Sequence, residues 1–137
     1  MQHLNFRFAG FFVRDVPATV GFYQRAFGIG MRYMHPSRGY AELATGDTLL
    51  GFLGEEFLRS TNLLGGIEMI CARPGKMPIG TLIALVSHDL DRDWRRAVDA
   101  GAVVVKLPEP KPWGQTAGYL QDMNGALVEL CTPSLRD

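Results

Sequence analysis

The chain has 137 residues, which is enough for one domain but too few for two of ordinary size. Hydrophobic residues make up 47% and charged residues 20%, so the composition predicts a packed core and excludes a disordered chain. Fourteen basic side chains balance fourteen acidic ones, so no overall field attracts nucleic acid or an anionic membrane. We therefore expect one soluble domain over residues 1–137, with neither nucleic acid nor a membrane as its partner.

Cysteine use and hydropathy favour a cytoplasmic location. Cys71 and Cys131 have no metal-binding or redox spacing, which is typical of reduced thiols. The apolar run at residues 8–13 is short and flanked by Arg7 and Arg14, unlike a signal peptide. No segment approaches the roughly 20 apolar residues of a membrane helix. The sequence thus predicts neither secretion nor membrane insertion.

The first half begins with a strand and a helix. Residues 6–13 are aromatic and β-branched, which predicts a buried strand. Asp15 fits a helix N-cap, and Pro17 falls in the first turn, where its missing N–H costs nothing. Apolar residues then recur every three or four positions over 16–27, and Gly28 is expected to end this helix.

Short strands separated by turn residues complete the first half. We predict three of them, at residues 29–34, 40–44 and 48–53. Residues 55–79 are interpreted as a linker, with a short helix within 55–64 and an extra strand at 67–72.

The same pattern then starts again. A strand at 82–86 leads to Asp89 and a helix that Gly101 closes. Further strands are predicted at 103–107, 118–121 and 126–131, with a proline-rich loop at 108–112 and a hairpin turn at 122–125.

The two halves form an internal repeat. Asp89 follows Asp15 by 74 residues, and each ends a strand and starts a helix. The predicted fold class is α+β: two βαβββ repeats, at about 1–54 and 80–137, forming a curled mixed sheet around a shared cleft. An unrelated α+β sandwich with coincidental spacing is the alternative.

Several short motifs resemble the vicinal oxygen chelate superfamily, which includes glyoxalase I, extradiol dioxygenases and bleomycin resistance proteins. Phe22-Tyr23 and Gly28 after Asp15 resemble its D…FY…LG signature. Three segments of the second half also resemble motifs of this superfamily: Asp89-Leu90-Asp91, Ala100-Gly101-Ala102 and the terminal segment Asp122–Leu130. In addition, Pro112–Gln115 looks like a loop of resistance-type members. The resemblance covers nearly the whole chain outside residues 55–80.

This resemblance also implies where a metal would bind. Metal-using members carry His, Gln or Glu on the first and last strand of each half. The matching positions here are Phe8, Leu50 or Gly51, Leu82 and Glu129. Only Glu129 can coordinate a cation, and a catalytic centre needs at least three protein ligands. We expect no metal and no cofactor; His35 and His88 are interpreted as solvated or capping residues.

Without metal ligands, the cleft should be apolar and aromatic. Phe8, Phe12 and Leu82 would line a pocket for a flat or cationic aromatic ligand, by stacking and cation–π contact. Alternatively, the two phenylalanines simply fill the space. Further candidate ligand-binding residues are Tyr40, Phe52, Tyr119 and Trp113, the last either a lid over the cleft or packed on the outer sheet face.

Glu129 is the candidate catalytic residue. A lone carboxylate in an apolar cleft can accept a hydrogen bond from a ligand or act as a general base. The alternative is a structural carboxylate bonded to Arg32, Arg38 or a backbone amide.

The preferred hypothesis is a metal-independent binding protein of the bleomycin-resistance type. It would act as a homodimer and sequester a small-molecule ligand, an aromatic or cationic toxic compound or metabolite, conferring antibiotic resistance. The alternative is a glyoxalase- or dioxygenase-like enzyme, a lyase or a dioxygenase, with a displaced metal site. An accessory domain that binds a protein partner is the third reading.

Overall fold

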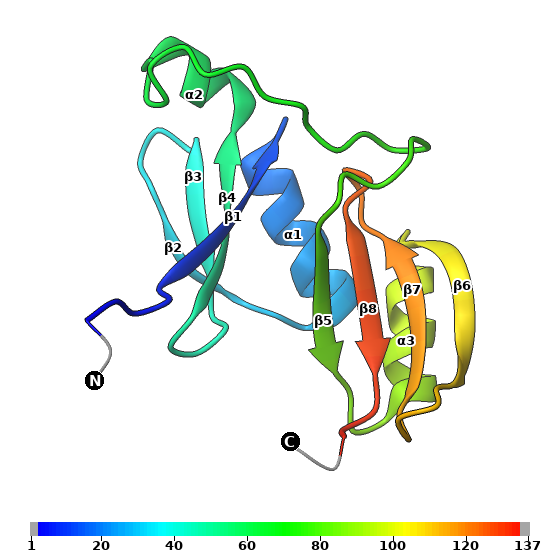
Figure 1. Ribbon diagram of the computed structural model, residues 1–137. Coiled ribbons are helices and arrows are strands. Elements are labelled where there is room, and N and C mark those ends of the chain that lie inside the picture. Colours follow the sequence, from blue (N-terminus) through cyan, green and yellow to red (C-terminus); the bar gives the residue numbers. More distant parts are fainter. Residues whose placement is uncertain (1–2, 135–137) are drawn as a thin grey trace. The chain divides into compact units, whose positions relative to one another are not determined.

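The chain divides into two compact units in the computed structural model, which describes residues 3–134 (Figure 1). The first unit contains the chain up to Gln24 together with Gly28–Cys71, and the second contains Arg25–Phe27 and the residues from Ala72 on. Each unit holds one four-stranded mixed sheet with a helix, which confirms the predicted α+β class. The division after Cys71 falls within the predicted linker, while the shared cleft stays a prediction.

The first unit has the predicted βαβββ order followed by a short helix. Its sheet runs β1-β4-β3-β2, with β1 parallel to β4 and the other neighbours antiparallel. The elements are β1 (Phe8–Val13), α1 (Val16–Phe27), β2 (Met31–Met34), β3 (Tyr40–Leu43), β4 (Leu49–Gly54) and α2 (Glu55–Ser60).

Helix α1 begins and ends as the sequence predicts. The Asp15 carboxylate accepts a hydrogen bond from the Ala18 N–H at 3.0 Å, which satisfies one of the unpaired N–H groups of the first turn. Gly28 ends the helix with φ 70°, a left-handed conformation that glycine adopts without steric cost. The apolar side of the helix packs on the sheet, where the Tyr23 ring lies 5.0 Å from Phe52.

The second unit repeats this arrangement. Its sheet runs β5-β8-β7-β6, again with one parallel pair, β5 and β8, and antiparallel neighbours elsewhere. The elements are β5 (Leu82–Val86), α3 (Leu90–Asp99), β6 (Val103–Pro110), β7 (Thr116–Gln121) and β8 (Leu127–Cys131). The internal repeat read from the spacing of Asp15 and Asp89 is therefore confirmed.

Local contacts fix the second unit in the same way. The Asp89 carboxylate caps α3 by accepting from the Arg92 N–H at 3.3 Å. Trp94 of α3 packs directly on Gly118 of β7, where an added Cβ would lie 2.6 Å from the indole ring. The Asp122 carboxylate accepts from the N–H groups of Asn124 and Ala126, which closes the predicted hairpin turn.

Two local predictions were wrong, whereas the short helix predicted within 55–64 is α2 at Glu55–Ser60. Residues 67–72 form no strand. Strand β6 continues through Pro110, although residues 108–112 suggested a loop. Proline is tolerated there because β6 is an edge strand whose register shifts between Lys106 and Glu109. Over residues 3–134, none of the helices is long and apolar enough to cross a membrane.

Candidate functional site

Two glycines are paired at the centre of the first sheet, and the positions of their missing side chains lie on the face opposite α1. Gly10 of β1 lies beside Gly51 of β4, and Gly51 in turn pairs with Glu42 of β3. The ring of Phe8 occupies the space above both glycines: an added Cβ at Gly10 would lie 2.5 Å from a Phe8 ring carbon. The glycine pair therefore lets the benzyl ring of Phe8 lie close against the sheet.

Three aromatic rings continue across this face. The Phe8 and Tyr40 rings are stacked with centroids 5.7 Å apart, and Tyr33 lies 6.3 Å from Tyr40 at a tilt. Phe8 and Tyr40 are half-buried, whereas Tyr33 at the outer end is 42% exposed. We call Phe8, Tyr40 and Tyr33 the aromatic row; its accessible part offers a stacking surface for a planar ring.

A buried carboxylate lies beside the aromatic row. Glu42 accepts a hydrogen bond from the Tyr40 hydroxyl at 2.6 Å and from the Arg32 guanidinium at 2.5 Å. The Arg7 guanidinium reaches the same carboxylate at 3.5 Å. The Glu42 side chain is only 5% exposed, whereas the two arginines are 69% and 56% exposed. We call these four residues the Glu42 cluster.

The protonation states within the Glu42 cluster follow from these contacts. The Tyr40 hydrogen bond, followed by the Arg32 guanidinium, lowers the pKa of Glu42 against the opposing effect of burial. Burial, with the neighbouring Glu42 carboxylate, raises the pKa of Tyr40. At neutral pH the cluster therefore holds an ionised carboxylate and a protonated phenol. Such a carboxylate is a poor base, and the arrangement suits positioning rather than proton abstraction.

The helix-free face of the second sheet brings three predicted site residues together. Glu129 of β8 pairs with Ala84 of β5 on one side and with Tyr119 of β7 on the other. Leu82 lies two residues before Ala84 on the same face and is 46% exposed. Glu129 itself is half-buried, and no hydrogen bond or ion pair reaches its carboxylate within the described part of this unit.

A cation already lies on this second face. The Lys111 ammonium is 5.1 Å from the Tyr119 ring centroid and 3.1 Å from the Glu109 carboxylate. Its side chain is only 11% exposed. Tyr119 therefore has a cation–π partner within its own unit.

The remaining predicted ligand-binding residues lie elsewhere. Phe52 is fully buried against Tyr23 on the helix-covered side of the first sheet, so it is a core residue and cannot line an open face. The error arose because the face of β4 could not be fixed from the sequence. Phe12 is half-buried on the same side as Phe8, in line with strand alternation. Trp113 is 61% exposed in the turn before β7, where its indole N–H donates to Gln115.

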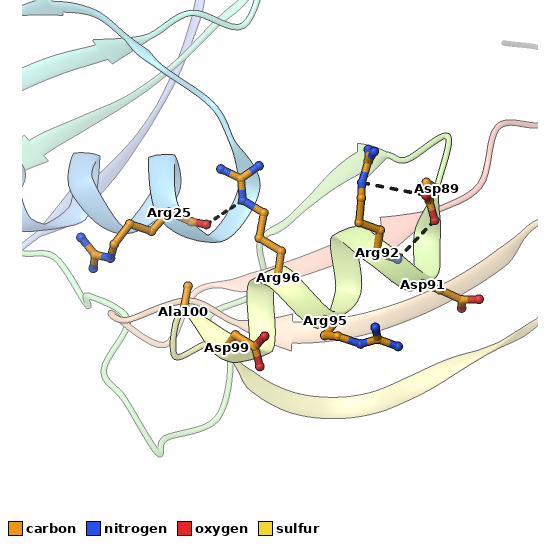
Figure 2. A pocket seen from close by; sticks show the side chains of 8 residues that line it. All are labelled: Arg25, Asp89, Asp91, Arg92, Arg95, Arg96, Asp99 and Ala100. Atoms are coloured by element: carbon orange, nitrogen blue, oxygen red, sulfur yellow. Dashed lines mark hydrogen bonds and ion pairs between the residues drawn. The ribbon is translucent and has the colours of Figure 1, made fainter.

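The surface of α3 carries a shallow charged hollow (Figure 2). Its lining residues are Arg25, Asp89, Asp91, Arg92, Arg95, Arg96, Asp99 and Ala100. Arg92 pairs with Asp89, and the Arg96 guanidinium donates to the Arg25 carbonyl at 2.9 Å. These contacts give Arg92 and Arg96 local structural roles. None of the eight lining residues is aromatic, so the hollow offers no stacking surface for a planar ring.

The residues present do not fit the metal that the fold implies. Phe8 covers Gly51 and Leu82 presents an isobutyl group, so Glu129 is the single donor among the four implied positions. Glu42 is already engaged by Tyr40 and Arg32. Among residues 3–134, no group of three or more His, Cys, Asp or Glu side chains gathers to hold a metal ion.

Sequence analysis identified Tyr40 as a candidate but missed its assembly with Glu42, Arg7 and Arg32 into one cluster. Tyr40 and Glu42 are two residues apart on one strand, and this spacing places both on the same face. What the sequence did not reveal is the pairing of β3 with Gly51 and of β2 with β3, which brings Arg32 and Arg7 to the carboxylate.

The fold and its internal repeat define a protein of the paired βαβββ class. The chain belongs to the glyoxalase/bleomycin resistance protein/dioxygenase superfamily, whose family model matches residues 2–130. No curated protein matches the chain significantly.

Solved structures share the fold at low sequence identity. A glyoxalase/bleomycin resistance protein/dioxygenase family enzyme from Burkholderia phytofirmans PsJN has a TM-score of 0.77 at 22% identity, covering 94% of this chain and 98% of that one. A glyoxalase-related enzyme from Fulvimarina pelagi gives 0.73 at 19% identity, with 97% and 89% covered. TioX from Micromonospora sp. ML1 gives 0.67 at 21% identity, with 93% and 98% covered.

Proposed function

We propose that this chain is a metal-independent binding protein that holds a planar aromatic compound against the aromatic row. The observation that carries the proposal is the run of neighbouring rings, Phe8 stacked on Tyr40 and Tyr33 tilted beside it, on the face of the first sheet opposite α1. In this superfamily the first-strand position occupied here by Phe8 is where metal-using members carry a ligand. A ring in its place converts a coordination site into a stacking surface.

The geometry favours binding over catalysis. Phe8 packs closely on Gly10 and Gly51, and Tyr40 is held by its bond to Glu42, so two of the three rings are fixed before a ligand arrives. A pre-ordered surface loses little conformational entropy on binding. Tyr33 is exposed at the outer end of the row and is free to adjust to the ligand's edge.

The test is a calorimetric and NMR titration with naphthalene-2-carboxamide, a neutral planar probe, in buffer containing EDTA. We expect saturable 1:1 binding that the chelator leaves unchanged. Tyr33→Leu should weaken binding roughly fivefold, because one aromatic contact is lost. Phe57→Leu is the matched control, since Phe57 packs on His35 and Gly39 outside the row.

Two results would reject the proposal. The first is an absence of binding for neutral, anionic and cationic naphthalene probes alike. The second is equal weakening by Tyr33→Leu and Phe57→Leu, which would locate the site elsewhere. Metal analysis of the purified protein after incubation with Ni, Mn, Fe or Zn provides a separate check: a stoichiometric ion bound through Glu129 would favour the enzymatic alternative.

Homodimer formation, a cytoplasmic location and a role in antibiotic resistance remain predictions from the sequence. Light scattering on the purified chain tests the first directly. A monomer at all concentrations would contradict the predicted homodimer and would leave the proposal for the aromatic row unchanged.

A further inference from the structure

The two arginines of the Glu42 cluster are placed beside the rings of the aromatic row. Arg7 directly precedes Phe8 on the chain, and Arg32 directly precedes Tyr33. Their guanidinium groups converge on Glu42, whose carboxylate is bonded to the hydroxyl of Tyr40. Charged donors thus lie at the edge of the surface on which a ring would stack.

The Glu42 cluster carries more positive than negative charge. Two guanidinium groups face one carboxylate, and no other acidic side chain pairs with Arg7 or Arg32 in the described part of the chain. Glu42 is already satisfied without Arg7, because Tyr40 donates to one oxygen at 2.6 Å and Arg32 to the other at 2.5 Å. The Arg7 contact at 3.5 Å is long, and its side chain is 69% exposed.

A guanidinium group has five N–H donors in a planar fork that matches the two oxygens of a carboxylate. Arg7 uses one of them, weakly, on Glu42. We propose that the aromatic row selects aromatic anions, in which a planar ring carries a carboxylate or similar group, with Arg7 as the principal anion-binding residue and Arg32 as its support. This inference rests on the proposed function and names its ligand class.

The same charges disfavour a cationic ligand on this face. An ammonium group stacked against the row would meet the two guanidinium groups before it met the buried Glu42 carboxylate, which is only 5% exposed. The preference should therefore run from anion to neutral to cation. It should also shrink as salt is added, because Arg7 and Arg32 are more than half exposed.

Three probes with the same ring system test the inference: 2-naphthoate, naphthalene-2-carboxamide and 2-naphthylmethylamine, titrated into the full chain at pH 7.5 and low salt. We expect 2-naphthoate to bind about tenfold more tightly than the carboxamide, the size of one good charge-assisted hydrogen-bond pair. The amine should bind most weakly.

Arg7→Gln and Arg14→Gln form a matched pair of variants, because each removes one positive charge from an exposed position near the ends of β1. Arg7→Gln should reduce 2-naphthoate affinity about tenfold and leave carboxamide affinity unchanged. Arg14→Gln should leave both affinities unchanged. Circular dichroism of both variants checks that the fold is retained.

The outcomes separate this inference from the proposed function. If the carboxamide binds as tightly as 2-naphthoate, the charge selection is wrong and the aromatic site stands. If Arg7→Gln and Arg14→Gln weaken 2-naphthoate equally, overall charge rather than the Glu42 cluster is responsible, and the inference is overturned. If none of the three probes binds, both the inference and the proposed function fail.

Discussion

The hydrogen bond between Tyr40 and Glu42 gives the most direct energetic test of the Glu42 cluster. The perturbation is a double-mutant cycle with Tyr40→Phe, Glu42→Gln and the double variant. The bond is 2.6 Å long, its acceptor is ionised, and the Glu42 side chain is 5% exposed. Hydrogen bonds to charged groups contribute about 1.5–3 kcal/mol, so a coupling energy of about 1.5 kcal/mol is expected for this half-buried pair.

Urea unfolding at pH 7, followed by circular dichroism, measures the four free energies of unfolding. The control cycle uses Lys106 and Glu109, which form a contact of similar length, 2.8 Å, but are largely exposed. Its coupling should be clearly smaller, since solvent screens exposed pairs. A Tyr40–Glu42 coupling no larger than the control would refute the view that the Glu42 cluster is a fixed, buried unit.

The same cycle has a predicted pH dependence. The pKa of Glu42 is lowered in the folded chain, chiefly by the Tyr40 hydrogen bond, so the unfolded chain takes up this proton at a higher pH than the folded one. The stabilisation is therefore complete above the ordinary glutamate range and is lost as pH falls below about 4. The coupling energy should decline in that window, and a coupling that is the same at pH 7 and pH 3 would contradict the view that the Tyr40 hydrogen bond favours the ionised form of Glu42.

Three further substitutions test the packing. Gly10→Ala should lower both stability and the affinity for aromatic probes, because its Cβ would lie 2.5 Å from the Phe8 ring and 2.5 Å from the Leu53 side chain; unchanged affinity and unchanged urea unfolding would contradict this placement. Gly118→Ala should destabilise the second unit by about 2 kcal/mol, since Trp94 lies 2.6 Å from the added atom, and a neutral effect on the melting temperature would argue against that contact. Asp15→Ala should cost about 1 kcal/mol through loss of the N-cap, whereas Asp15→Asn should cost much less in the same assay.

Much of the fold could be predicted because local signals and the repeat agreed. Asp15 and Asp89 each bring a capping carboxylate to the start of a helix, and their equal spacing from the flanking strands marks the repeat. Gly28 ends α1 through its own left-handed backbone conformation, and Asp122 closes its turn by accepting a hydrogen bond from the N–H of Asn124, so each depends on few neighbouring residues. Such features are readable from sequence since their causes lie within a few residues.

Features that depend on strand pairing were harder to predict. Phe52 was expected to face a ligand and instead packs under α1, because a continuous apolar strand such as β4 does not reveal which face is covered. The irregular segment at 67–72 is rich in apolar residues yet finds no strand partner. For β6, the prolines suggested a loop, but an edge position accommodates them.

In the candidate site, too, the residues that depend on strand pairing could not be predicted from the sequence. Phe8 and Leu82 were identified from the spacing to the capping aspartates, and both lie on helix-free faces. The Glu42 cluster draws its members from two strands, β2 and β3, and from the segment before β1, and its assembly depends on the pairing of these strands within the sheet. No local pattern encodes that pairing.

In the function that we propose, a planar ligand stacks on the aromatic row without a metal ion. The most direct measurement is an NMR titration of the full chain with 2-naphthoate in the presence of EDTA, following the aromatic ring signals. We predict saturable shifts concentrated on the rings of Phe8, Tyr33 and Tyr40. Shifts confined to the second sheet around Tyr119, or to the charged surface of α3, would contradict the claim.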